Sequence, residues 1–427
     1  MRDMRDSGVE WIGEVPANWE ITRIKNCFEL RNERNYEALE DVNLISLYTD
    51  RGVVQHCDLT ETTGNKAVTA DGYKLVYERD IVVNIILCWM GAVGMSKYNG
   101  VTSPAYDVYK PIDDVVSEYY HYLFRTPQFN GECYRYGRGI MLMRWRTYST
   151  EFGAINIPLP PRETQLKIVE HLDQKCGQID ALIANVQAQI EKLKAYKQSV
   201  ITEVVTKGLD PSAPMKDSGV DWIGEIPMHW NIVATKYLFE IFSGATPKSE
   251  IIENWDEDII WITPADYKTD DVFVSCGRRN LSEQGFASCS TSIIPVNSII
   301  FSKRAPIGAV AINTVELCTN QGCLSCVNKD ESNINAKFFY YVMAIATEHY
   351  ELLGSGTTFK EISASNFANF VLPWPAIDEQ IAMVEYLDDK CTMIAQLIAI
   401  KQKKINKLTE YKKSIIYEYV TGKKEVS

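Results

Sequence analysis

The sequence predicts a mixed α/β protein with a pseudo-two-fold internal repeat, in which two globular modules are separated by two long antiparallel coiled-coil helices. Two repeated segments predict this architecture. The stretch DSGVEWIGEVPANW at 6–19 returns as DSGVDWIGEIPMHW at 217–230, with 10 of 14 positions identical, and we name both copies the DSGV motif. The segment 165–206 returns at 380–421, with 22 of 42 positions identical. A period of about 210 residues is too long for stacked short units, so it indicates globular modules on a duplicated support.

The longer repeat predicts two helices of about 45 residues, roughly 65 to 70 Å each. Apolar residues recur at spacings of three and four over more than five heptads, which is typical of a coiled-coil seam. No proline interrupts either copy, and each copy follows a proline cluster, PLPP at 158–161 or PWP at 373–375, as suits a helix start. The residues expected to pack the helices together are Leu172, Ile179, Ile183, Ile190, Leu193, Leu387, Ile394, Ile398, Ile405 and Leu408.

Two lysines favour antiparallel packing of these helices. Lys197 and Lys412 occupy equivalent seam positions, so they would face and repel each other in a parallel, in-register pair. Antiparallel packing separates them. The alternative is that each lysine extends from the edge of the seam into solvent, in which case neither one reports on direction.

The remaining sequence forms two divergent inserts, each expected to be a mixed α/β module. Short β-rich runs alternate with Gly, Asp and Asn, and one helix is expected in each insert, near 117–124 and near 336–353. A few matches (GAV at 91–93 and 308–310, Gly-x-Gly at 137–139 and 354–356, Phe152 and Phe367) predict a shared fold with different surfaces. The expected segments are 1–157 for the first DSGV motif and module, 158–207 for the first helix, 208–216 for a linker, 217–372 for the second motif and module, and 373–427 for the second helix.

Composition excludes several classes of protein. Hydrophobic content of 46% and charged content of 23% are average for globular proteins, and a net charge of -12 argues against coating nucleic acid by charge alone. The longest apolar run, 81–95, is too short to span a bilayer and contains Asn84, so we interpret it as buried strand. The start of the chain lacks the apolar core of a secretory signal, and we expect a cytoplasmic protein without membrane contact.

The cysteines and the known catalytic motifs indicate no catalytic or metal site. Among eleven cysteines the tightest group is Cys318, Cys323 and Cys326, with one CxxC and no second ligand pair, so we expect buried side chains rather than a metal site. The sequence contains no GxxxxGK[ST], HExxH or GxSxG, no GxGxxG after a strand, and no Asp/Asn-Pro-Pro-aromatic tetrad of an amino methyltransferase. We therefore expect no catalytic residues in this chain.

One stretch of the first insert has the composition of a nucleic-acid contact. Residues 125–148 interleave arginines with aromatics and glycines in an expected loop, which suits phosphate contact and the reading of base edges. The alternative is a solvated turn whose Tyr and Trp lie in the core. The candidate residues are Arg125, Arg135, Tyr136, Arg138, Arg144, Trp145 and Arg146.

The second insert has a thinner set of candidates. Two arginines follow a glycine at 277, a basic pair lies in FSKRAPIG, and hydroxyl and amino groups lie in the loop GSGTTFKEIS. These candidates for DNA contact are Arg278, Arg279, Lys303, Arg304, Thr357, Thr358 and Lys360.

These features together resemble the specificity subunit of type I restriction-modification enzymes. The resemblance rests on the DSGVEWIGEVPANW start, on PLPP followed by QLKIVEHLD, on the doubled plan and on GSGTTFKEIS before PWP, and it covers essentially the whole chain. The first insert departs from that pattern, because it has GRGIMLMRWRTYS in place of the GSGTTF loop.

The resemblance implies a DNA sequence-specificity subunit in which two target-recognition domains each read one half of a bipartite, asymmetric site in double-stranded DNA. It implies that the helices set the spacing and dock two methyltransferase subunits, and through them the restriction/translocase subunits. The family's adenine methyltransferase and endonuclease activities would then reside in those partners, with S-adenosylmethionine, ATP and Mg bound there and no cofactor in this chain. One alternative is a stand-alone DNA methyltransferase or nuclease with unrecognised motifs, and another is a coiled-coil scaffold that does not touch DNA.

Overall fold

The computed structural model describes residues 3–58, 69–112, 115–139, 145–267, 272–355 and 360–426. The chain divides into two compact units. Unit 1 comprises Met1–Gln187 with Gln402–Ser427, and unit 2 comprises Ala188–Lys401. Each unit therefore contains one module together with parts of both long helices, and unit 1 is assembled from the two ends of the chain.

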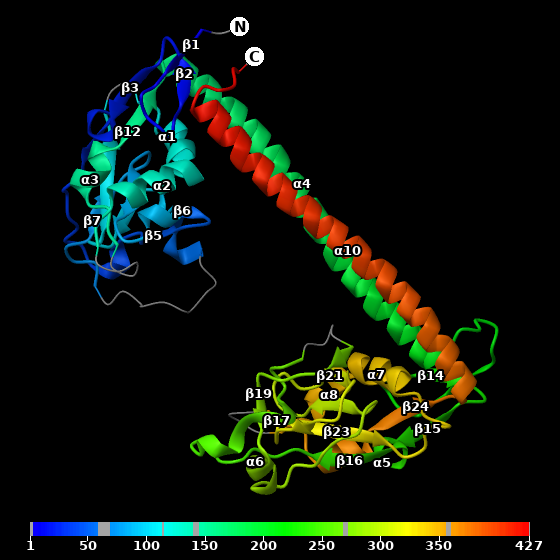
Figure 1. The fold of residues 1–427 in the computed structure, drawn as a ribbon. Coiled ribbons are helices and arrows are strands. Elements are labelled where there is room, and N and C mark those ends of the chain that lie inside the picture. The colour runs from blue at the N-terminus through cyan, green and yellow to red at the C-terminus, as the bar shows by residue number, and fades with distance from the viewer. Residues whose placement is uncertain are drawn as a thin grey trace. The chain divides into compact units, whose positions relative to one another are not determined.

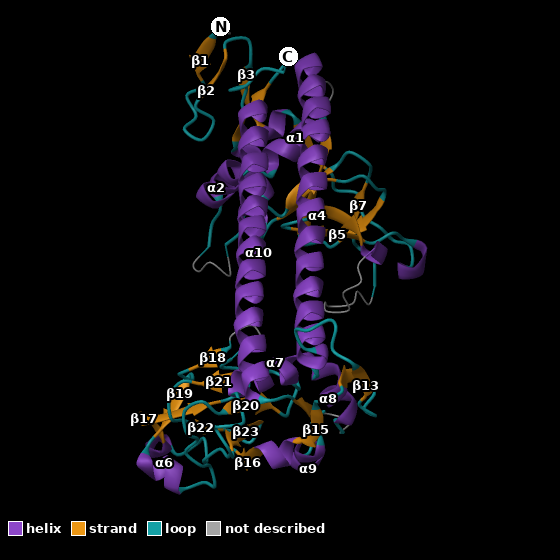
Figure 2. Ribbon diagram, turned by 90° about the vertical axis from the view of Figure 1, so that its right-hand side faces the viewer, coloured by secondary structure: helices purple, strands orange, loops and turns teal. Residues whose placement is uncertain are grey.

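The long helices begin where the prolines predict. Helix α4 runs over Arg162–Lys207 and α10 over Ile377–Val420, with 46 and 44 residues. Within each unit their segments lie side by side in opposite directions, so that higher residue numbers on one helix meet lower numbers on the other (Figure 1; Figure 2). The pairs in contact are Asp180 with Lys412 and His171 with Tyr419 in unit 1, and Gln189 with Lys401 in unit 2. The predicted antiparallel packing is confirmed.

The ten residues expected on the seam all lose solvent contact. Those that are buried are Leu172, Ile179, Ile190, Leu387, Ile394 and Ile405. Those that are half-buried are Ile183, Leu193, Ile398 and Leu408. Of the two seam lysines, Lys412 forms a 2.7 Å ion pair with Asp180 of the opposite helix. Packing of this stripe, rather than helix propensity alone, is what stabilises helices of such length.

The first module is built around an antiparallel sheet with strand order β4-β11-β8-β9. Helices α1, α2 and α3 accompany it, and short two-stranded sheets flank it. The strands are β1 Met4–Asp6, β2 Glu14–Pro16, β3 Glu20–Arg23, β4 Phe28–Leu30, β5 Ile45–Tyr48, β6 Gly52–Gln55, β7 Lys74–Val76, β8 Ile81–Asn84, β9 Val93–Met95, β10 Gly100–Thr102, β11 Tyr106–Pro111 and β12 Asn156–Leu159. The helices are α1 Ser117–Phe124, α2 Pro127–Tyr136 and α3 Ser149–Ala154.

The second module has a sheet with the order β16-β23-β20-β21-β18, so its first four strands repeat the order of the first module. This confirms that the modules share a fold. The strands are β13 Met215–Asp217, β14 Glu225–Pro227, β15 Asn231–Ala234, β16 Phe239–Ser243, β17 Trp255–Ile262, β18 Phe273–Val274, β19 Arg279–Leu281, β20 Ile299–Ser302, β21 Val310–Asn313, β22 Cys318–Thr319, β23 Cys323–Asn328 and β24 Val371–Trp374. The helices are α5 Thr235–Leu238, α6 Glu283–Ala287, α7 Ala336–Ile345, α8 Thr347–Leu353 and α9 Ala364–Asn369.

The apolar run at 81–95 is not one strand, as the sequence suggested, but the two strands β8 and β9 with a turn between them. The Asn84 side chain accepts the backbone N–H of Ile86 at 2.9 Å, which ends β8. Gly91 has a φ of 90°, a left-handed conformation that favours glycine, and Gly308 has a φ of 89° before the equivalent strand of the second module. The matching GAV sequences therefore mark one shared turn.

Each DSGV motif forms a hairpin that packs on the end of a long helix. In unit 1, the Tyr417 hydroxyl near the end of α10 donates to the Trp11 carbonyl at 2.7 Å. In unit 2, the second motif follows α4 directly, and its Trp230 packs with Val204 of that helix. The first motif is thus bound to the last helix of the chain, an arrangement that the linear order of the sequence did not predict.

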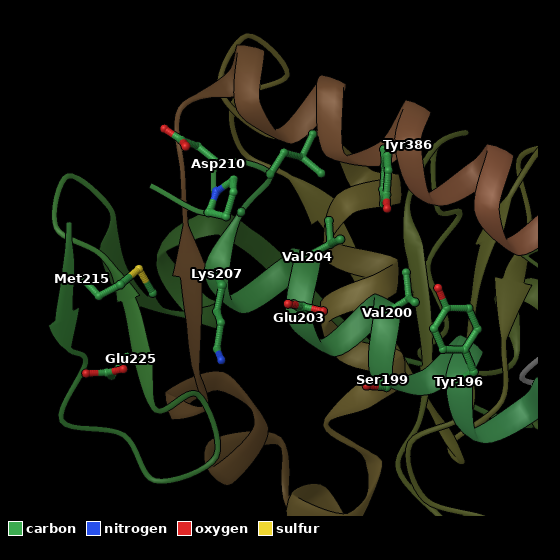
Figure 3. Close-up of a pocket in the computed structure, with 13 residues that line it drawn as sticks. Tyr196, Ser199, Val200, Glu203, Val204, Lys207, Asp210, Met215, Glu225 and Tyr386 are labelled. Atoms are coloured by element: carbon green, nitrogen blue, oxygen red, sulfur yellow. The ribbon is translucent and has the colours of Figure 1, made fainter. Parts of the chain in front are cut away.

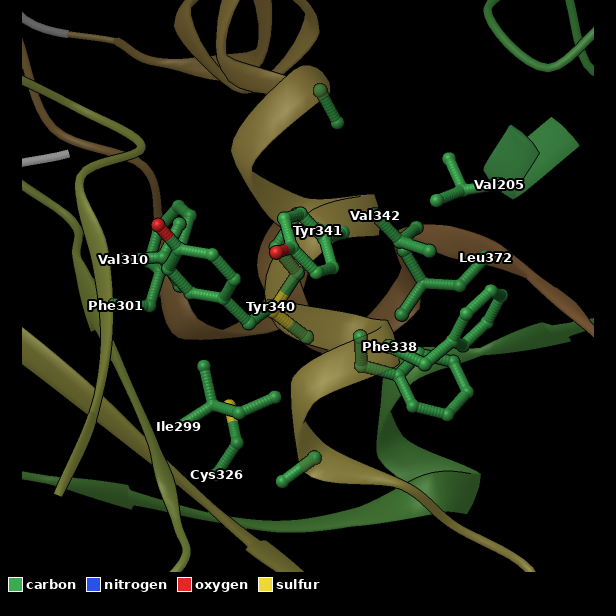
Figure 4. Packing of buried hydrophobic residues seen from close by; sticks show 14 of the residues in the cluster. Val205, Ile299, Phe301, Val310, Cys326, Phe338, Tyr340, Tyr341, Val342 and Leu372 are labelled. Carbon is green, nitrogen blue, oxygen red and sulfur yellow. The ribbon is translucent and has the colours of Figure 1, made fainter. Parts of the chain in front are cut away.

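The core of the second module places α7 between the sheet and the helix end. Phe301 and Val310 of the sheet lie on one side of α7, while Val205 and Leu372 lie near its other side (Figure 4). The aromatic residues 338–341, which lie within the helix expected near 336–353, are buried here. Cys318, Cys323 and Cys326 are also buried in strands, and the described residues contain no group of three His, Cys, Asp or Glu side chains placed to hold a metal ion.

None of the described helices combines the length and the apolar character needed to cross a bilayer.

Candidate nucleic-acid interface

The segment expected to be a loop at 125–148 is helical over its first half, so that expectation was wrong for α2, Pro127–Tyr136. The Thr126 hydroxyl caps this helix by accepting the Phe129 N–H at 3.3 Å, and Pro127 occupies the first turn. A Thr-Pro pair is a recognised helix-start signal that was present in the sequence and outweighed by the glycines.

Arg125 is engaged in holding the module together. Its guanidinium donates to the carbonyls of Val93 at 3.2 Å, Thr49 at 3.3 Å and Asp50 at 2.7 Å. Burial lowers the pKa of this guanidinium from its ordinary value. These contacts tie the end of α1 to the β5–β6 turn and leave Arg125 half-buried.

The end of α2 presents two exposed arginines, each paired with a carboxylate. Arg135 donates to Glu132 at 2.8 Å, and Arg138 lies 3.1 Å from Glu151 of α3. The side chains of Arg135 and Arg138 are 56% and 77% exposed, whereas those of both carboxylates are largely buried. The two arginines border an open hollow of about 580 Å³ in which a polyanion has direct access to them.

A short backbone ladder closes the loop that follows α2. Arg138 and Arg146 exchange two backbone hydrogen bonds, at 2.8 and 2.9 Å. Trp145 stacks on Tyr134 at 4.9 Å between ring centroids, and its indole N–H donates to the Tyr134 carbonyl. This loop continues through Arg144, a predicted contact residue that lies outside the described residues.

Tyr136, the remaining candidate of the first module, is half-buried at the end of α2. The Arg135 guanidinium lies over its ring at 5.3 Å from the centroid. The ring therefore supports an exposed arginine, while its own surface is largely covered.

Two candidates of the second module, Lys303 and Arg304, pair with one carboxylate. Glu361 accepts from Lys303 at 3.0 Å and from Arg304 at 2.7 Å. Burial raises the pKa of the Glu361 carboxyl, but the hydrogen bonds from the two cations outweigh it, and the pKa lies below its ordinary value. Glu361 thus remains ionised and holds both cations.

The loop of the second module is closed in the same way as the loop of the first. Ser355 and Glu361 exchange two backbone hydrogen bonds of 3.0 Å. Lys360 is exposed within this loop, and Thr357 and Thr358, also predicted contacts, lie outside the described residues.

Arg278 and Arg279 lie elsewhere, on the edge of the sheet with strand order β19-β17-β22. Arg278 is 3.4 Å from Asp266. Arg279 lies over the Trp255 ring at 4.1 Å and pairs with Asp256, a non-glycine residue with a φ of 67°. The structure therefore divides the second module's candidates into two separate places.

One backbone contact shows that the two loops are equivalent. The Thr147 N–H donates to the Ile85 carbonyl at 2.8 Å, and the Ile362 N–H donates to the Lys303 carbonyl at 3.0 Å. Ile85 and Lys303 both follow the corresponding strand, β8 or β20. We name the two equivalent regions the reading ends: 135–139 with 145–151 in the first module, and 303–304 with 354–355 and 360–361 in the second.

The carboxylates of the reading ends were not among the residues predicted from the sequence, which were cations, aromatics and two threonines. The pairing of Glu132 could have been predicted, because it lies three residues before Arg135, and residues at this spacing on a helix are neighbours. Glu151 and Glu361 are brought to their partners by the fold. Paired in this way, the described cations of the reading ends are held in oriented, charge-assisted contacts.

These features define a class of protein: two modules of one fold, each with a basic reading end, mounted on an antiparallel helix pair. A family model described as the type I restriction modification DNA specificity domain matches residues 227–410. The chain is 35% identical over 173 residues to the type I restriction enzyme MjaIX specificity subunit of Methanocaldococcus jannaschii, a match that covers 39% of this chain and 40% of that protein. It is 25% identical to the putative MjaX specificity subunit of the same organism, over 96% of this chain and 95% of that protein.

Solved structures show the same fold. A chain from a study of complex assembly and conformational transition of the type I R-M system matches with a TM-score of 0.71 and 15% identity, covering 95% of this chain and 98% of that chain. The HsdS subunit from Thermoanaerobacter tengcongensis matches with a TM-score of 0.51 and 15% identity, covering 96% and 98%. Residues 227–410 thus match a type I restriction modification DNA specificity domain, and the whole chain is similar to specificity subunits of type I restriction enzymes.

Proposed function

We propose that each module reads one half of a bipartite, asymmetric site in double-stranded DNA through its reading end. The observation that carries the proposal is the equivalence of the two loops. Each is attached to its module by an equivalent backbone hydrogen bond, yet the two carry different side chains. A reader of two different half-sites requires a constant frame and variable donors. Arginine held in a fixed orientation suits bidentate contact with guanine, while lysine suits phosphate.

The paired carboxylates give the reading ends a second property. A cation already paired with Glu132, Glu151 or Glu361 is oriented before DNA arrives, which reduces the ordering cost of binding. The same carboxylates weaken indiscriminate attraction to phosphate, because part of the positive charge is neutralised. With a net charge of -12, the chain depends on local geometry and on surfaces that its partners supply.

The partners we propose are two methyltransferase subunits, with restriction/translocase subunits joined through them. Support comes from exposed apolar side chains on the long helices that occur at equivalent positions in both repeats. These pairs, 42% to 55% exposed, are Leu166 with Ile381, Leu182 with Leu397, and Tyr196 with Tyr411. Exposed apolar groups kept in both copies indicate surfaces that a partner covers twice.

Unit 2 also has an open hollow of about 630 Å³ beside these helices. Tyr196, Val200 and Val204 of α4 line it together with Tyr386 of α10 and Glu225 of the second DSGV motif (Figure 3). Its mixed apolar and polar lining suits a protein surface. We assign it to the methyltransferase contact in unit 2.

Chemistry is proposed to reside in those partners, which would hold S-adenosylmethionine, ATP and Mg. The competing function is a stand-alone methyltransferase or nuclease. Incubation of the purified chain with DNA and labelled S-adenosylmethionine separates the two: we expect label in DNA only after the methyltransferase subunit is added. Methyl transfer by the chain alone would overturn the assignment.

The reading ends are tested by paired variants in the complex with methyltransferase. Arg138→Ala with Arg146→Ala should weaken recognition of one half-site only, and Lys303→Ala with Arg304→Ala should weaken the other, by about 1 to 3 kcal/mol for each lost base contact. Footprinting and methylation of sites mutated in either half measure this. Unchanged affinity and specificity in both variants would remove the reading ends from the interface.

A further inference from the structure

The strongest repeat in the chain contains two polar residues that neither the helix seam nor DNA reading explains. Gln165 and Asp173 lie near the start of α4, and Gln380 and Asp388 occupy the same positions in α10. In each helix the two residues are eight positions apart, or about two turns. Between them lie Leu172 and Leu387, which are fully buried.

Each glutamine joins the module helix to the proline break before its own long helix. In unit 1, Gln165 accepts the Val116 N–H at 2.9 Å, immediately before α1, and donates to the Pro160 carbonyl at 2.8 Å. Its side chain is buried, so both hydrogen bonds replace contacts with water that the fold has removed.

Unit 2 repeats this arrangement. Gln380 accepts the Asn335 N–H at 2.9 Å, immediately before α7, and donates to the carbonyls of Pro375 at 2.9 Å and Asn333 at 3.0 Å. The glutamine is again buried. The same side chain therefore makes the same two kinds of contact in units whose module sequences have diverged.

The aspartates make a second contact to the same module helices. The Tyr122 hydroxyl of α1 donates to Asp173 at 2.6 Å, and the Tyr341 hydroxyl of α7 donates to Asp388 at 2.7 Å. Burial, followed by the hydrogen bond to the aspartate, raises the pKa of both tyrosines, so both remain protonated donors near neutral pH. Lys337 adds a 2.6 Å ion pair to Asp388 in unit 2.

We propose that Gln165 with Asp173, and Gln380 with Asp388, are positioning residues that fix each module's direction on its own long helix, so that the spacing between the two half-sites is read strictly. This rests on the function proposed above. One contact alone would act as a pivot, whereas two contacts about two helical turns apart, together with the buried packing of Leu172 or Leu387 between them, restrain rotation of the module. The two glutamines are buried, while Asp173 is exposed and Asp388 is half-buried. Directional hydrogen bonds of this kind define geometry more than they add stability.

The physical consequence concerns base-pair register. Successive base pairs lie about 3.4 Å apart and turn by about one tenth of a revolution. A module able to rock on its helix by a few ångströms would reach its half-site when the spacing is one base pair longer or shorter. A module fixed at two points would not.

The test uses the full chain in complex with methyltransferase and a set of duplexes that contain both half-sites at the native spacing and at one base pair more or less. In Tyr122→Phe and Tyr341→Phe the hydroxyl alone is lost, and the ring still fills its place. We expect methylation at the altered spacings, relative to the native one, to rise about tenfold, the effect of losing one hydrogen bond to a charged group. The half-site sequences should not change.

Two controls separate positioning from general damage. Tyr237→Phe removes a tyrosine hydroxyl from an exposed residue of unit 2 and should leave the spacing preference unchanged. Asp173→Asn keeps an acceptor for the Tyr122 hydroxyl and should retain most of the preference, whereas Asp173→Ala should lose it.

The possible outcomes are distinct. Wild-type spacing preference in folded Tyr122→Phe and Tyr341→Phe overturns the positioning role, as does equal loss at every spacing, which marks a merely structural contact. If the wild-type complex methylates no two-part site at all, the proposed function fails and not the positioning role. If Tyr122→Phe lowers the unfolding midpoint, the comparison of Asp173→Asn with Asp173→Ala replaces it. A retained spacing preference in Asp173→Asn and a lost one in Asp173→Ala support the positioning role, and equal preferences overturn it.

Discussion

The reading ends of the two modules are attached by equivalent backbone hydrogen bonds, yet their cations are paired with carboxylates in different ways. In the first module Arg135 and Arg138 each have a carboxylate of their own. In the second, Lys303 and Arg304 share Glu361. The difference indicates that backbone hydrogen bonds hold the loop in the same place in both modules, while the pairing of cations with carboxylates can vary. It also predicts unequal sensitivity, because losing the shared carboxylate releases two cations together.

The largest effect is expected when one module is removed, which tests whether the two half-units are equivalent. A fragment of residues 1–212 keeps the first module and α4, but it lacks the part of α10 that completes unit 1. Two copies should supply each other, with α4 of one copy replacing α10 of the other. We expect a dimer that, with methyltransferase, methylates a symmetric site made of two first half-sites. Size-exclusion chromatography and methylation mapping measure this, and a folded, inactive monomer would refute the pseudo-two-fold model.

Glu361→Gln tests the shared carboxylate. The variant should retain the fold but lose the ionic anchor of Lys303 and Arg304, so discrimination against a mutated second half-site should fall about tenfold, while binding to unrelated DNA rises. Competition binding at fixed salt measures both quantities. Glu132→Gln is the matched control, since it releases Arg135 alone; if it changes discrimination as much as Glu361→Gln does, the proposed difference between the modules disappears.

His121 gives unit 1 a pH dependence that the second module should lack, because Tyr340 occupies the equivalent position of α7. Burial, with the nearby charges of Arg125 and Lys97, lowers the pKa of His121 from 6.5 to about 3. Between these values the unfolded chain binds a proton that the folded chain excludes, so stability is present above about pH 6.5 and is lost as pH falls.

We expect unit 1 to lose about 1.4 kcal/mol from this group between pH 7.5 and pH 5.5. Amide hydrogen exchange in β9, corrected for the intrinsic pH effect, measures it, and α7 provides an internal reference. In His121→Asn, which has an acceptor for the Met95 N–H but no titrating ring, this loss should vanish. An equal loss in wild type and variant would assign the pH dependence to other groups.

Tyr119→Phe tests a smaller contrast between α1 and α7. The buried Tyr119 hydroxyl donates to the Val420 carbonyl at 2.6 Å, whereas the equivalent residue of α7 is Phe338. Removing the hydroxyl leaves that carbonyl short of a partner and should cost about 1 kcal/mol. Amide exchange at 417–422 should accelerate about fivefold. Tyr148→Phe, which alters an exposed ring, should leave these amides unchanged.

The smallest effect is expected on the helix pair. Lys412 joins Asp180 across the seam in unit 1, where the equivalent of Asp180 in the second repeat is Ala395. Because both side chains are partly exposed, Lys412→Ala should cost only about 0.2 to 1 kcal/mol, and less at high salt. Urea unfolding at two salt concentrations measures this; a loss that does not depend on salt would indicate packing by the lysine stem instead.

The sequence was most informative where a pattern extends over many residues. Heptads sustained across α4 and α10, with prolines before each, predicted both helices, and the equivalent seam positions of Lys197 and Lys412 favoured their antiparallel direction. Short sequence patterns that point to different structures were interpreted wrongly. The glycines at 131 and 137 suggested a loop, whereas Thr126 and Pro127 start helix α2. The turn at Gly91 was hidden within a continuous apolar run.

Predicting the reading ends was harder, because a residue's role there depends on what the fold brings beside it. Arg125 and Arg138 look alike in sequence, yet one is bonded to three carbonyls and the other is exposed next to Glu151. The predicted DNA contacts remain predictions. The Gln and Asp of each long helix were visible as identities but not as contacts, since their partners lie far away in the chain.

The docking of the first DSGV motif on the end of α10 has a consequence for biosynthesis. Unit 2 consists of one continuous stretch, so it can fold as soon as that stretch leaves the ribosome. Unit 1 has to wait for Tyr417 and its neighbours, the partners of a motif that is synthesised 406 residues earlier. At about 5 to 20 residues per second the delay lasts on the order of tens of seconds. During that interval the first module exposes the apolar surface that α10 later covers, which makes nascent unit 1 the part of the chain most exposed to chaperones and to misassembly.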